Sequence, residues 1–334
     1  MTPTHLWRRV ATLAGRGFAL LLTLALTAWA AAALYFDLLP GTSLRTLGAS
    51  SYGLAMVGAL PTFRGRGKAI AICLAGFALV LAWWLTLKPS NDRAWQPDVA
   101  QTAWAEIDGD HVTIHNVRNC DYRTEGDYTP HWETRAYDLA QIRGMDIFLT
   151  YWGSPWIAHP IVSFQFGDND YIAMSIETRK EVGEQYSAIR GFFRYYELIY
   201  TVSDERDVVR LRTNYRKGEE TYLFHTRATP EHARATFLNY LKKINRIRNR
   251  PEWYNALTNN CTTNIATLAG EPQLDWRVLL NGRADQMLFE RGDLATGNLP
   301  FAQLKQQAHI NAAARAANDA PDFSRRIREG RAGF

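Results

Sequence analysis

Two uncharged stretches near the N-terminus constrain the fold of this chain more than any other feature. Residues Gly17–Phe36 form a run of 20 uncharged residues, and Ala69–Leu87 form another of 19. A helix needs about 20 mostly apolar residues to cross a bilayer. A cleaved signal peptide would have a shorter apolar core and would leave the second stretch unexplained. We therefore expect membrane-spanning helices near residues 17–36 and 69–87.

A third stretch, Thr46–Phe63, is uncharged for 18 residues but is interrupted by glycines, serines and a proline. Basic clusters precede the first and the last stretch: Arg8, Arg9 and Arg16, then Arg64, Arg66 and Lys68. Basic flanks of membrane helices stay cytoplasmic, so a third span near residues 46–63 would bring both clusters to that side. We predict three spans in a bacterial inner membrane, with the soluble part in the periplasm. With only two spans, the soluble part would lie on the same side of the membrane as the N-terminus.

The charge balance separates the membrane region from the rest of the 334-residue chain. Residues 1–87 hold seven of the 38 Lys and Arg and one of the 33 Asp and Glu. The remainder, with 31 basic and 32 acidic residues, has a net charge of −1, which argues against nucleic acid as a partner. The partner that we expect is the lipid bilayer. The sequence contains no HExxH or CxxC zinc spacing and no phosphate-binding glycine loop, so we expect neither a metal nor a cofactor.

The soluble part alternates strand-like runs with helices. The predicted strands are His111–Val117, Ile157–Phe166, Tyr171–Thr178, Glu197–Val202, Val208–Arg212 and Thr221–Thr226. A helix capped by Thr229 begins at Pro230 and ends before Pro251. Strands followed by helices indicate an α+β domain. The tail from Ala302 onwards resembles a surface helix with a loose end.

Cys261 is the first candidate catalytic residue. It follows Asn259 and Asn260, either of which can cap a helix, and the helical pattern after it stops at Gly270. A thiol at a helix N-terminus lies beside unpaired N–H groups and the positive end of the helix dipole, which favour the thiolate. The same groups can receive an oxyanion, so Asn260 and Thr262 flank a predicted oxyanion position. A buried, inert cysteine is the alternative.

A predicted hairpin supplies a base for this thiol. Two alternating strands flank the turn residues Gly167-Asp168-Asn169-Asp170. His159 lies on the polar face of the first strand, and Glu177 lies on that of the second. Matching these faces requires a connection with an odd number of residues, which places His159 near Glu177. We predict His159 as the base and Glu177 as its orienting carboxylate. A surface histidine beside a Glu177–Arg179 ion pair is the alternative.

Several short motifs of the soluble part follow the order known from one protein family. They are Tyr137-Asp138-Leu139, Ile157-Ala158-His159, Ser163-Phe164-Gln165-Phe166, Ser175-Ile176-Glu177-Thr178-Arg179, Tyr200, Asp204-Glu205-Arg206-Asp207-Val208, Tyr254-Asn255 and Asn260-Cys261-Thr262-Thr263. On these motifs, residues from about 116 to about 308 resemble the Lnb-type N-terminal periplasmic domain family. That family is similar to circularly permuted NlpC-type and lecithin:retinol acyltransferase-type thiol enzymes, in which the histidine precedes the cysteine.

The resemblance implies a permuted papain-like (NlpC-type) thiol-enzyme domain at residues 116–308. Before it we expect a membrane region at 1–88 and a linker with the first strand at 89–115, and after it a tail at 309–334. The resemblance assigns the base to His159 and the nucleophile to Cys261. Because the named member acts in lipoprotein N-acylation, it also implies an acyltransferase whose substrates are phospholipids or lipoproteins.

Two other functions fit the same residues. A thiol hydrolase could cut peptidoglycan peptides or other amides with the same pair, and a non-catalytic envelope protein would keep Cys261 and His159 apart. The membrane anchor and the aromatic content favour the acyltransferase, for which a hydrophobic groove near Cys261 is expected. We further expect Cys120 and Cys261 to be unbridged, because a nucleophile in a permanent disulfide cannot act.

Overall fold

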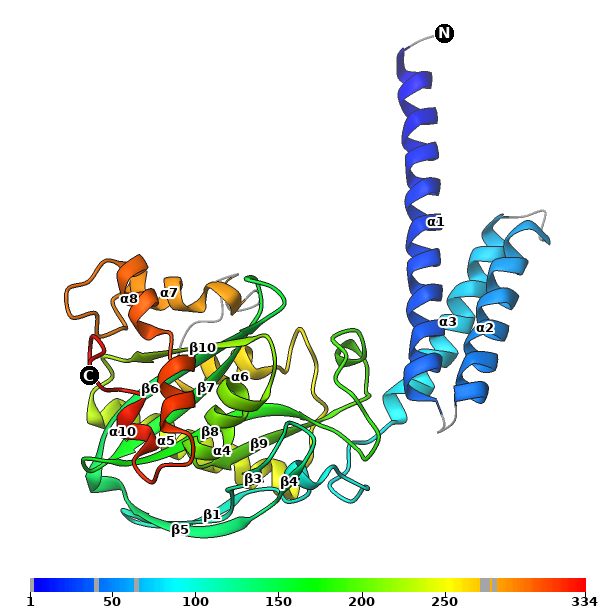
Figure 1. Cartoon of the computed structure of the whole chain (residues 1–334). Coiled ribbons are helices and arrows are strands. Elements are labelled where there is room, and N and C mark those ends of the chain that lie inside the picture. Colours follow the sequence, from blue (N-terminus) through cyan, green and yellow to red (C-terminus); the bar gives the residue numbers. More distant parts are fainter. Residues whose placement is uncertain (1–2, 39–41, 63–65, 271–276, 278–280) are drawn as a thin grey trace. The chain divides into compact units, whose positions relative to one another are not determined.

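The computed structural model of the protein describes residues 3–38, 42–62, 66–270, 277 and 281–334 (Figure 1). The chain divides into two compact units. The first comprises Met1–Pro89 and Ser187–Tyr195, and the second comprises Ser90–Tyr186 and Tyr196–Phe334. The predicted membrane region, residues 1–88, thus coincides with most of the first unit. The exception is the segment Ser187–Tyr195, which joins this unit from far along the sequence.

The first unit is built from three helices, α1 (Pro3–Asp37), α2 (Thr42–Thr62) and α3 (Arg66–Thr86), each packed against the other two. Two of them contain segments long and apolar enough to cross a membrane, Val10–Asp37 and Gly67–Thr86. These segments match the stretches predicted to span. The third predicted stretch, residues 46–63, is helical as α2, and its crossing stays a prediction. Phe63 at its end and Arg64 of the second basic cluster lie outside the described residues.

The second unit is organised around one mixed sheet. Its path runs β1-β2-β9-β8-β7-β6-β10, and β5 pairs with β2 beside this path. The strands are β1 (Trp104–Asp108), β2 (His111–Arg118), β5 (Trp132–Asp138), β6 (Ile142–Trp152), β7 (Ala158–Phe166), β8 (Asp170–Arg179), β9 (Glu197–Ser203) and β10 (Glu219–His225). All neighbours pair antiparallel except β2 and β9, which meet in parallel. A two-stranded sheet, β3 (Asp121–Tyr122) with β4 (Tyr128–Thr129), accompanies it.

Helices pack on both faces of this sheet, which confirms the predicted α+β class. They are α4 (Glu205–Arg210), α5 (Pro230–Asn249), α6 (Cys261–Leu268), α7 (Ala284–Arg291), α8 (Phe301–Ala308), α9 (Asn311–Ala317) and α10 (Phe323–Arg326). On one face Phe164 of β7 packs against Phe237 of α5, with ring centroids 5.0 Å apart. On the other, Ile161 of β7 belongs to a buried cluster with Val208 of α4 and Phe323 of α10. Successive side chains of β7 therefore pack against helices on opposite faces of the sheet.

Most of the elements that local patterns predicted are present in the structure. The structure contains strands at five of the six predicted positions, and α5 begins at Pro230 with Thr229 as its cap. The exception is Val208–Arg212, predicted as a strand. It belongs to α4 and to the π-helical turn Leu211–Tyr215, because the Asp204 side chain accepts the N–H of Arg206 and starts a helix. The long strand β6 was not predicted.

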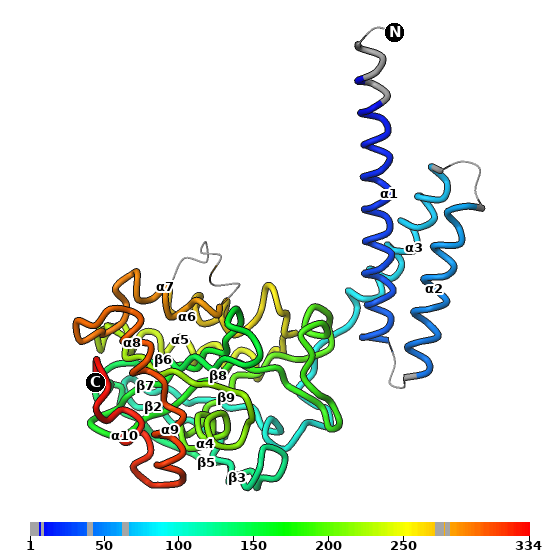
Figure 2. The backbone as a smooth tube through the Cα atoms, turned by 45° about the horizontal axis from the view of Figure 1, so that its top comes forward, coloured from blue at the N-terminus to red at the C-terminus, as the bar shows by residue number. Residues whose placement is uncertain are grey.

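The C-terminal residues are not a loose tail, contrary to the prediction for residues 309–334. Ile310, Ala314, Phe323 and Ile327 are buried in the same cluster as Phe148 of the sheet. Figure 2 shows α9 and α10 beside α4, and α10 contacts both of them. Burying four apolar side chains stabilises this end of the chain as part of the core.

Candidate active site

The hairpin of β7 and β8 brings His159 to Glu177. Phe166 pairs with Asp170 and Ile161 pairs with Ser175, so the turn between the strands contains three residues. This is the odd-numbered connection predicted from the two polar faces. His159 Nε2 lies 3.2 Å from Glu177 Oε1. The paired ladder ends at Ile161 and Ser175, and the histidine and the carboxylate lie just beyond that end.

Ser175 connects the imidazole to the carboxylate. Its Oγ lies 2.7 Å from His159 Nε2 and donates a hydrogen bond of 2.7 Å to Glu177 Oε1. Because the Ser175 hydroxyl donates its proton in the hydrogen bond to Glu177, its Oγ can only accept a hydrogen bond from the N–H at His159 Nε2. This arrangement assigns the ring proton to Nε2 and leaves Nδ1 of a neutral imidazole as an acceptor.

Arg212 neutralises Glu177 from another element. Its Nη2 lies 2.9 Å from Glu177 Oε1, and its Nη1 lies 3.3 Å from Glu219 Oε2. The side chains of His159 and Arg212 are 9% and 5% exposed, and that of Glu177 is 25% exposed. Burial raises the pKa of Glu177, but the charges of His159 and Arg212 lower it further, to well below 4.5. Glu177 is therefore an anion at neutral pH.

The pKa of His159 is raised by its surroundings. Burial lowers it, as does the charge of Arg212, yet the charge of Glu177 and the hydrogen-bonding effects of Cys261 and Glu177 outweigh both, so the pKa lies above 6.5. The effect of Cys261 on this pKa indicates that its thiol lies near the imidazole. An imidazolium stabilised in this way favours an adjacent thiolate.

Cys261 is the first residue of α6, as predicted. Asn260 caps the helix in a capping box: its side chain accepts from the N–H of Thr263, whose hydroxyl accepts from the N–H of Asn260. The Asn260 amide also donates to the carbonyl of Ala256 at 2.7 Å. This side chain is thus engaged in positioning the helix. The N–H groups of Cys261 and Thr262 are in the first turn, where a helix has no acceptor of its own.

The charge of Cys261 affects three tyrosines. Burial and then the charge of Cys261 raise the pKa of Tyr254 and Tyr186, and the same charge contributes for the fully buried Tyr240. Thr262 Oγ1 lies 3.8 Å from Sγ and accepts a hydrogen bond of 2.6 Å from the Asn281 amide. All three cysteines are free, so Cys120 and Cys261 are unbridged.

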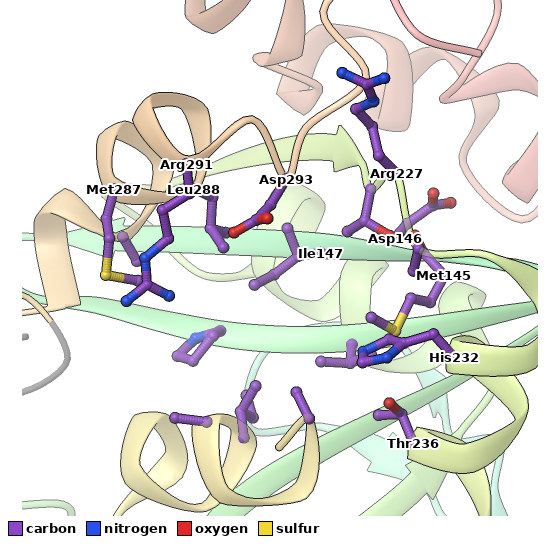
Figure 3. Close-up of a pocket in the computed structure, with 18 of the residues that line it drawn as sticks. Met145, Asp146, Ile147, Arg227, His232, Thr236, Met287, Leu288, Arg291 and Asp293 are labelled. Atoms are coloured by element: carbon purple, nitrogen blue, oxygen red, sulfur yellow. Dashed lines mark hydrogen bonds between the residues drawn. The ribbon is translucent and has the colours of Figure 1, made fainter. Parts of the chain in front are cut away.

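A cavity of about 600 Å³ is lined by Thr262, the residue that follows Cys261. Thr262 and Tyr240 belong both to its wall and to the neighbourhood of Cys261. Figure 3 shows Met287, Leu288 and Arg291 of α7 at one end of the cavity, His232 and Met145 at the other, and Ile147 between them. Its apolar lining comprises Ile147, Pro160, Val162, Ile265, Ala266, Ala269, Ala284, Met287 and Leu288. A cavity with these walls suits an apolar ligand.

Sequence reasoning missed two residues of the site. Ser175 lies two positions before Glu177, so the alternation of β8 already placed both side chains on one face. Arg212 left no local signal, because its segment was predicted as a strand and the contact spans 35 residues. Within the described residues, no group of three or more His, Cys, Asp or Glu side chains is arranged to hold a metal ion.

Comparison with known proteins identifies one family. Residues 128–283 match the family described as the Lnb N-terminal periplasmic domain, and this range includes His159, Ser175, Glu177, Arg212 and Cys261. No curated protein and no solved structure matches the chain. Two helices of the first unit are long and apolar enough to anchor such a domain in a membrane. Residues 128–283 are thus similar to the Lnb N-terminal periplasmic domain family.

Proposed function

We propose that this domain is a thiol acyltransferase that uses Cys261 as nucleophile and His159 as base. The observation that carries the proposal is that Cys261 starts α6 close enough to affect an imidazole whose Nε2 is held by Ser175 and Glu177. A nucleophile, a base and a group that orients the base are the parts that covalent acyl transfer requires. The order of His159 before Cys261 agrees with a permuted papain-like arrangement.

The proposed reaction begins with transfer of the thiol proton to Nδ1 of His159. The thiolate attacks the ester carbonyl carbon of a phospholipid or lipoprotein, and the carbonyl oxygen gains the negative charge. The N–H groups of Cys261 and Thr262 stabilise this oxyanion. When the C–O bond breaks, His159 returns its proton to the leaving alkoxide and a thioester remains on Cys261. An amine then attacks the thioester carbonyl carbon and His159 takes a proton from the amine. The C–S bond breaks to leave an amide and the Cys261 thiolate, and His159 returns the proton to this sulfur to restore the thiol.

The cavity beside Thr262 supports an acyl chain as the group transferred. Its volume lies within the range of about 300–1,000 Å³ that is typical of small-molecule sites. Ala266 of α6 and Met287 of α7 face this space, and a long chain bound there would extend along apolar side chains from the thioester. A peptide substrate would instead require hydrogen-bonding partners along the wall, and the wall near Thr262 is mostly apolar.

The test is detection of the thioester. Full-length protein in proteoliposomes is incubated with a phospholipid or a diacylated lipopeptide that carries an alkyne-tagged acyl chain, and Cys261 is analysed by mass spectrometry. We expect a hydroxylamine-labile acyl group on Cys261 that is absent from Cys261→Ala. His159→Ala should slow acylation by about 10²–10⁴-fold, the usual contribution of a general base. Cys120→Ala, which removes another buried thiol, is the matched control and should acylate normally.

The fate of the thioester separates transferase from hydrolase. A domain that acylates an added amine acceptor is a transferase, whereas release of free acid alone, with or without acceptor, indicates hydrolysis. Transfer that persists in Cys261→Ala would contradict the proposal. Failure of both lipid donors to acylate Cys261, when a soluble peptide ester does so, would point to the amidase alternative.

The cavity has its own test. Ala266→Phe should fill part of the space and shift the preferred donor towards shorter acyl chains, while Ala316→Phe on the exposed side of α9 should not. An unchanged chain-length profile in a folded Ala266→Phe protein would place the acyl chain elsewhere.

We further propose that the anchor lies in the inner membrane and crosses it three times. The basic clusters before α1 and α3 support this arrangement. Alkaline phosphatase fused after Phe334 should be active, and a cytoplasm-specific reporter at the same position should be inactive. The reverse pattern would contradict both the third span and the periplasmic placement.

A further inference from the structure

The segment Ser187–Tyr195 comes from the soluble part of the sequence but belongs structurally to the helical unit. Phe193 anchors it, because its buried ring lies 5.0 Å from that of Phe36 of α1 and 6.2 Å from that of Trp29. The same buried cluster includes Ala33 of α1 and Val80 of α3. The segment is therefore fixed to the membrane helices by apolar packing.

Polar contacts fix the segment to the ends of these helices. Arg194 donates to the carbonyls of Trp84 and Leu87, both at 2.8 Å, where α3 ends. The backbone N–H of Arg194 donates to Asp37 at 3.2 Å, and Asp37 is the last residue of α1. The guanidinium of Arg45, in the first turn of α2, lies over the ring of Tyr195. All of these contacts are at the same end of the three helices.

The location of this end follows from the helix lengths. The apolar segment Gly67–Thr86 contains 20 residues, which at 1.5 Å per residue gives about 30 Å, the thickness of a bilayer's hydrocarbon core. When α3 spans that core, its end at Thr86 lies in the headgroup layer. Trp83 and Trp84 mark this end, as aromatic residues do at membrane boundaries. The segment bound there lies at the same depth.

Two apolar side chains of the segment face outward. Ile189 is 62% exposed and Phe192 is 42% exposed, beside the anchored Phe193. Arg190 lies between them in sequence and donates to the Tyr195 hydroxyl at 3.1 Å. Exposed apolar residues next to arginine and tyrosine are typical of elements that enter the interface between headgroups and acyl chains.

We infer that Ser187–Tyr195 is a bilayer-interface element, in which Ile189 and Phe192 enter the acyl region and Arg190 contacts lipid phosphate. Its occupant is the lipid bilayer that holds α1 and α3, because the element is attached where these helices end. The preceding residue in the chain is Tyr186, whose pKa is raised by burial and then by the charge of Cys261. On the proposed function, the element would deliver lipid from the bilayer to the site, but its insertion does not depend on that function.

Cysteine labelling tests the insertion directly. All three native cysteines are buried. In a Cys261→Ala background, which also lacks the proposed nucleophile, an added exposed cysteine therefore carries the label. An environment-sensitive fluorophore at Ile189→Cys in proteoliposomes should emit at shorter wavelength and be quenched several-fold by lipids with quenchers on their acyl chains. The matched control is Ala316→Cys, exposed on α9, which should show aqueous emission and no such quenching.

Equal, aqueous emission from both positions would overturn the inference. A second arm compares Ile189→Glu/Phe192→Glu with wild type on two donors. Acylation of Cys261 by bilayer phospholipid should fall several-fold, while acylation by a water-soluble thioester should stay unchanged; an equal loss on both donors would contradict lipid delivery. If neither donor acylates the wild type, the proposed function fails, and the fluorescence result still decides insertion.

Discussion

Replacing Glu177 by Gln should narrow the pH range in which Cys261 reacts. The substitution preserves the side-chain shape and an acceptor for Ser175 but removes a charge 3.2 Å from His159 Nε2. At that distance, effective dielectric constants between 80 and 20 give an interaction of about 1–5 kcal/mol. Because a quarter of the Glu177 side chain is exposed, we expect the lower half of this range.

The direction of the change follows from the charges that remain. In the wild type, the pKa of His159 lies above 6.5 because Glu177 and the hydrogen bonds outweigh burial and Arg212. Without the Glu177 charge, burial and Arg212 weigh more heavily, so the pKa of His159 should fall. The imidazolium that stabilises a thiolate is then lost at lower pH. Alkylation of Cys261 near neutral pH should therefore slow by about ten- to a hundredfold, one decade for each ~1.4 kcal/mol of lost interaction.

The assay is the rate of alkylation by iodoacetamide from acidic to mildly alkaline pH, with thermal unfolding to verify the fold. Glu219→Gln is the matched control, because it removes the other carboxylate on Arg212 without touching His159. Its profile should stay close to that of the wild type. Arg212→Met should raise the pKa of His159, since Arg212 lowers it. A wild-type profile for a folded Glu177→Gln protein would refute the assignment of Glu177.

Three further predictions concern stability, measured by thermal unfolding of the full-length protein in detergent. Arg328→Met should destabilise the protein by about 3–5 kcal/mol, because it leaves two buried carboxylates without their cation, whereas the exposed Arg325→Met should change little. Phe323→Ala should cost about 3–5 kcal/mol, and a near-neutral effect would restore the loose-tail interpretation. Burial raises the pKa of Glu197 to about 7 despite Arg93, so wild-type stability should fall as pH rises from about 4.5 to about 7. Glu197→Gln should lose that dependence and gain up to about 3 kcal/mol relative to wild type, and parallel pH curves would contradict it.

The features predicted best from the sequence were those fixed by neighbouring residues. The pairing of His159 with Glu177 followed from strand alternation and the parity of the turn, which together permit one register. The start of α6 followed from Asn260, whose side chain satisfies an N–H group that a helix leaves free. In both cases a few adjacent side chains determine the backbone, so no tertiary information was needed.

The errors have tertiary causes. Val208–Arg212 alternates like a strand, but its two valines pack under the sheet while Asp204 caps a helix. β6 is buried on both faces in its middle, so residues 147–149 are all apolar and show no alternation. The C-terminal helices are short, and besides the buried apolar cluster they are attached through Arg328, which binds Asp146 and Glu205 from 182 and 123 positions away.

The packing of helices on both faces of the sheet explains why the candidate site could be predicted only in part. The candidate site is a series of interacting side chains. Ion pairs connect Glu219 to Arg212, Arg212 to Glu177 and Glu177 to His159, and the Cys261 thiol lies next in the series. The thiol comes from α6, which packs on the face of β7 that carries Pro160 and Val162. His159 shares its strand face with Ile161, which packs on α4, and Arg212 follows that helix. The two layers meet beyond the last β7–β8 pair, where the strands no longer bond to each other and α6 can reach the imidazole. A sequence pattern reports one face of one element, whereas this series requires side chains from both faces of the sheet.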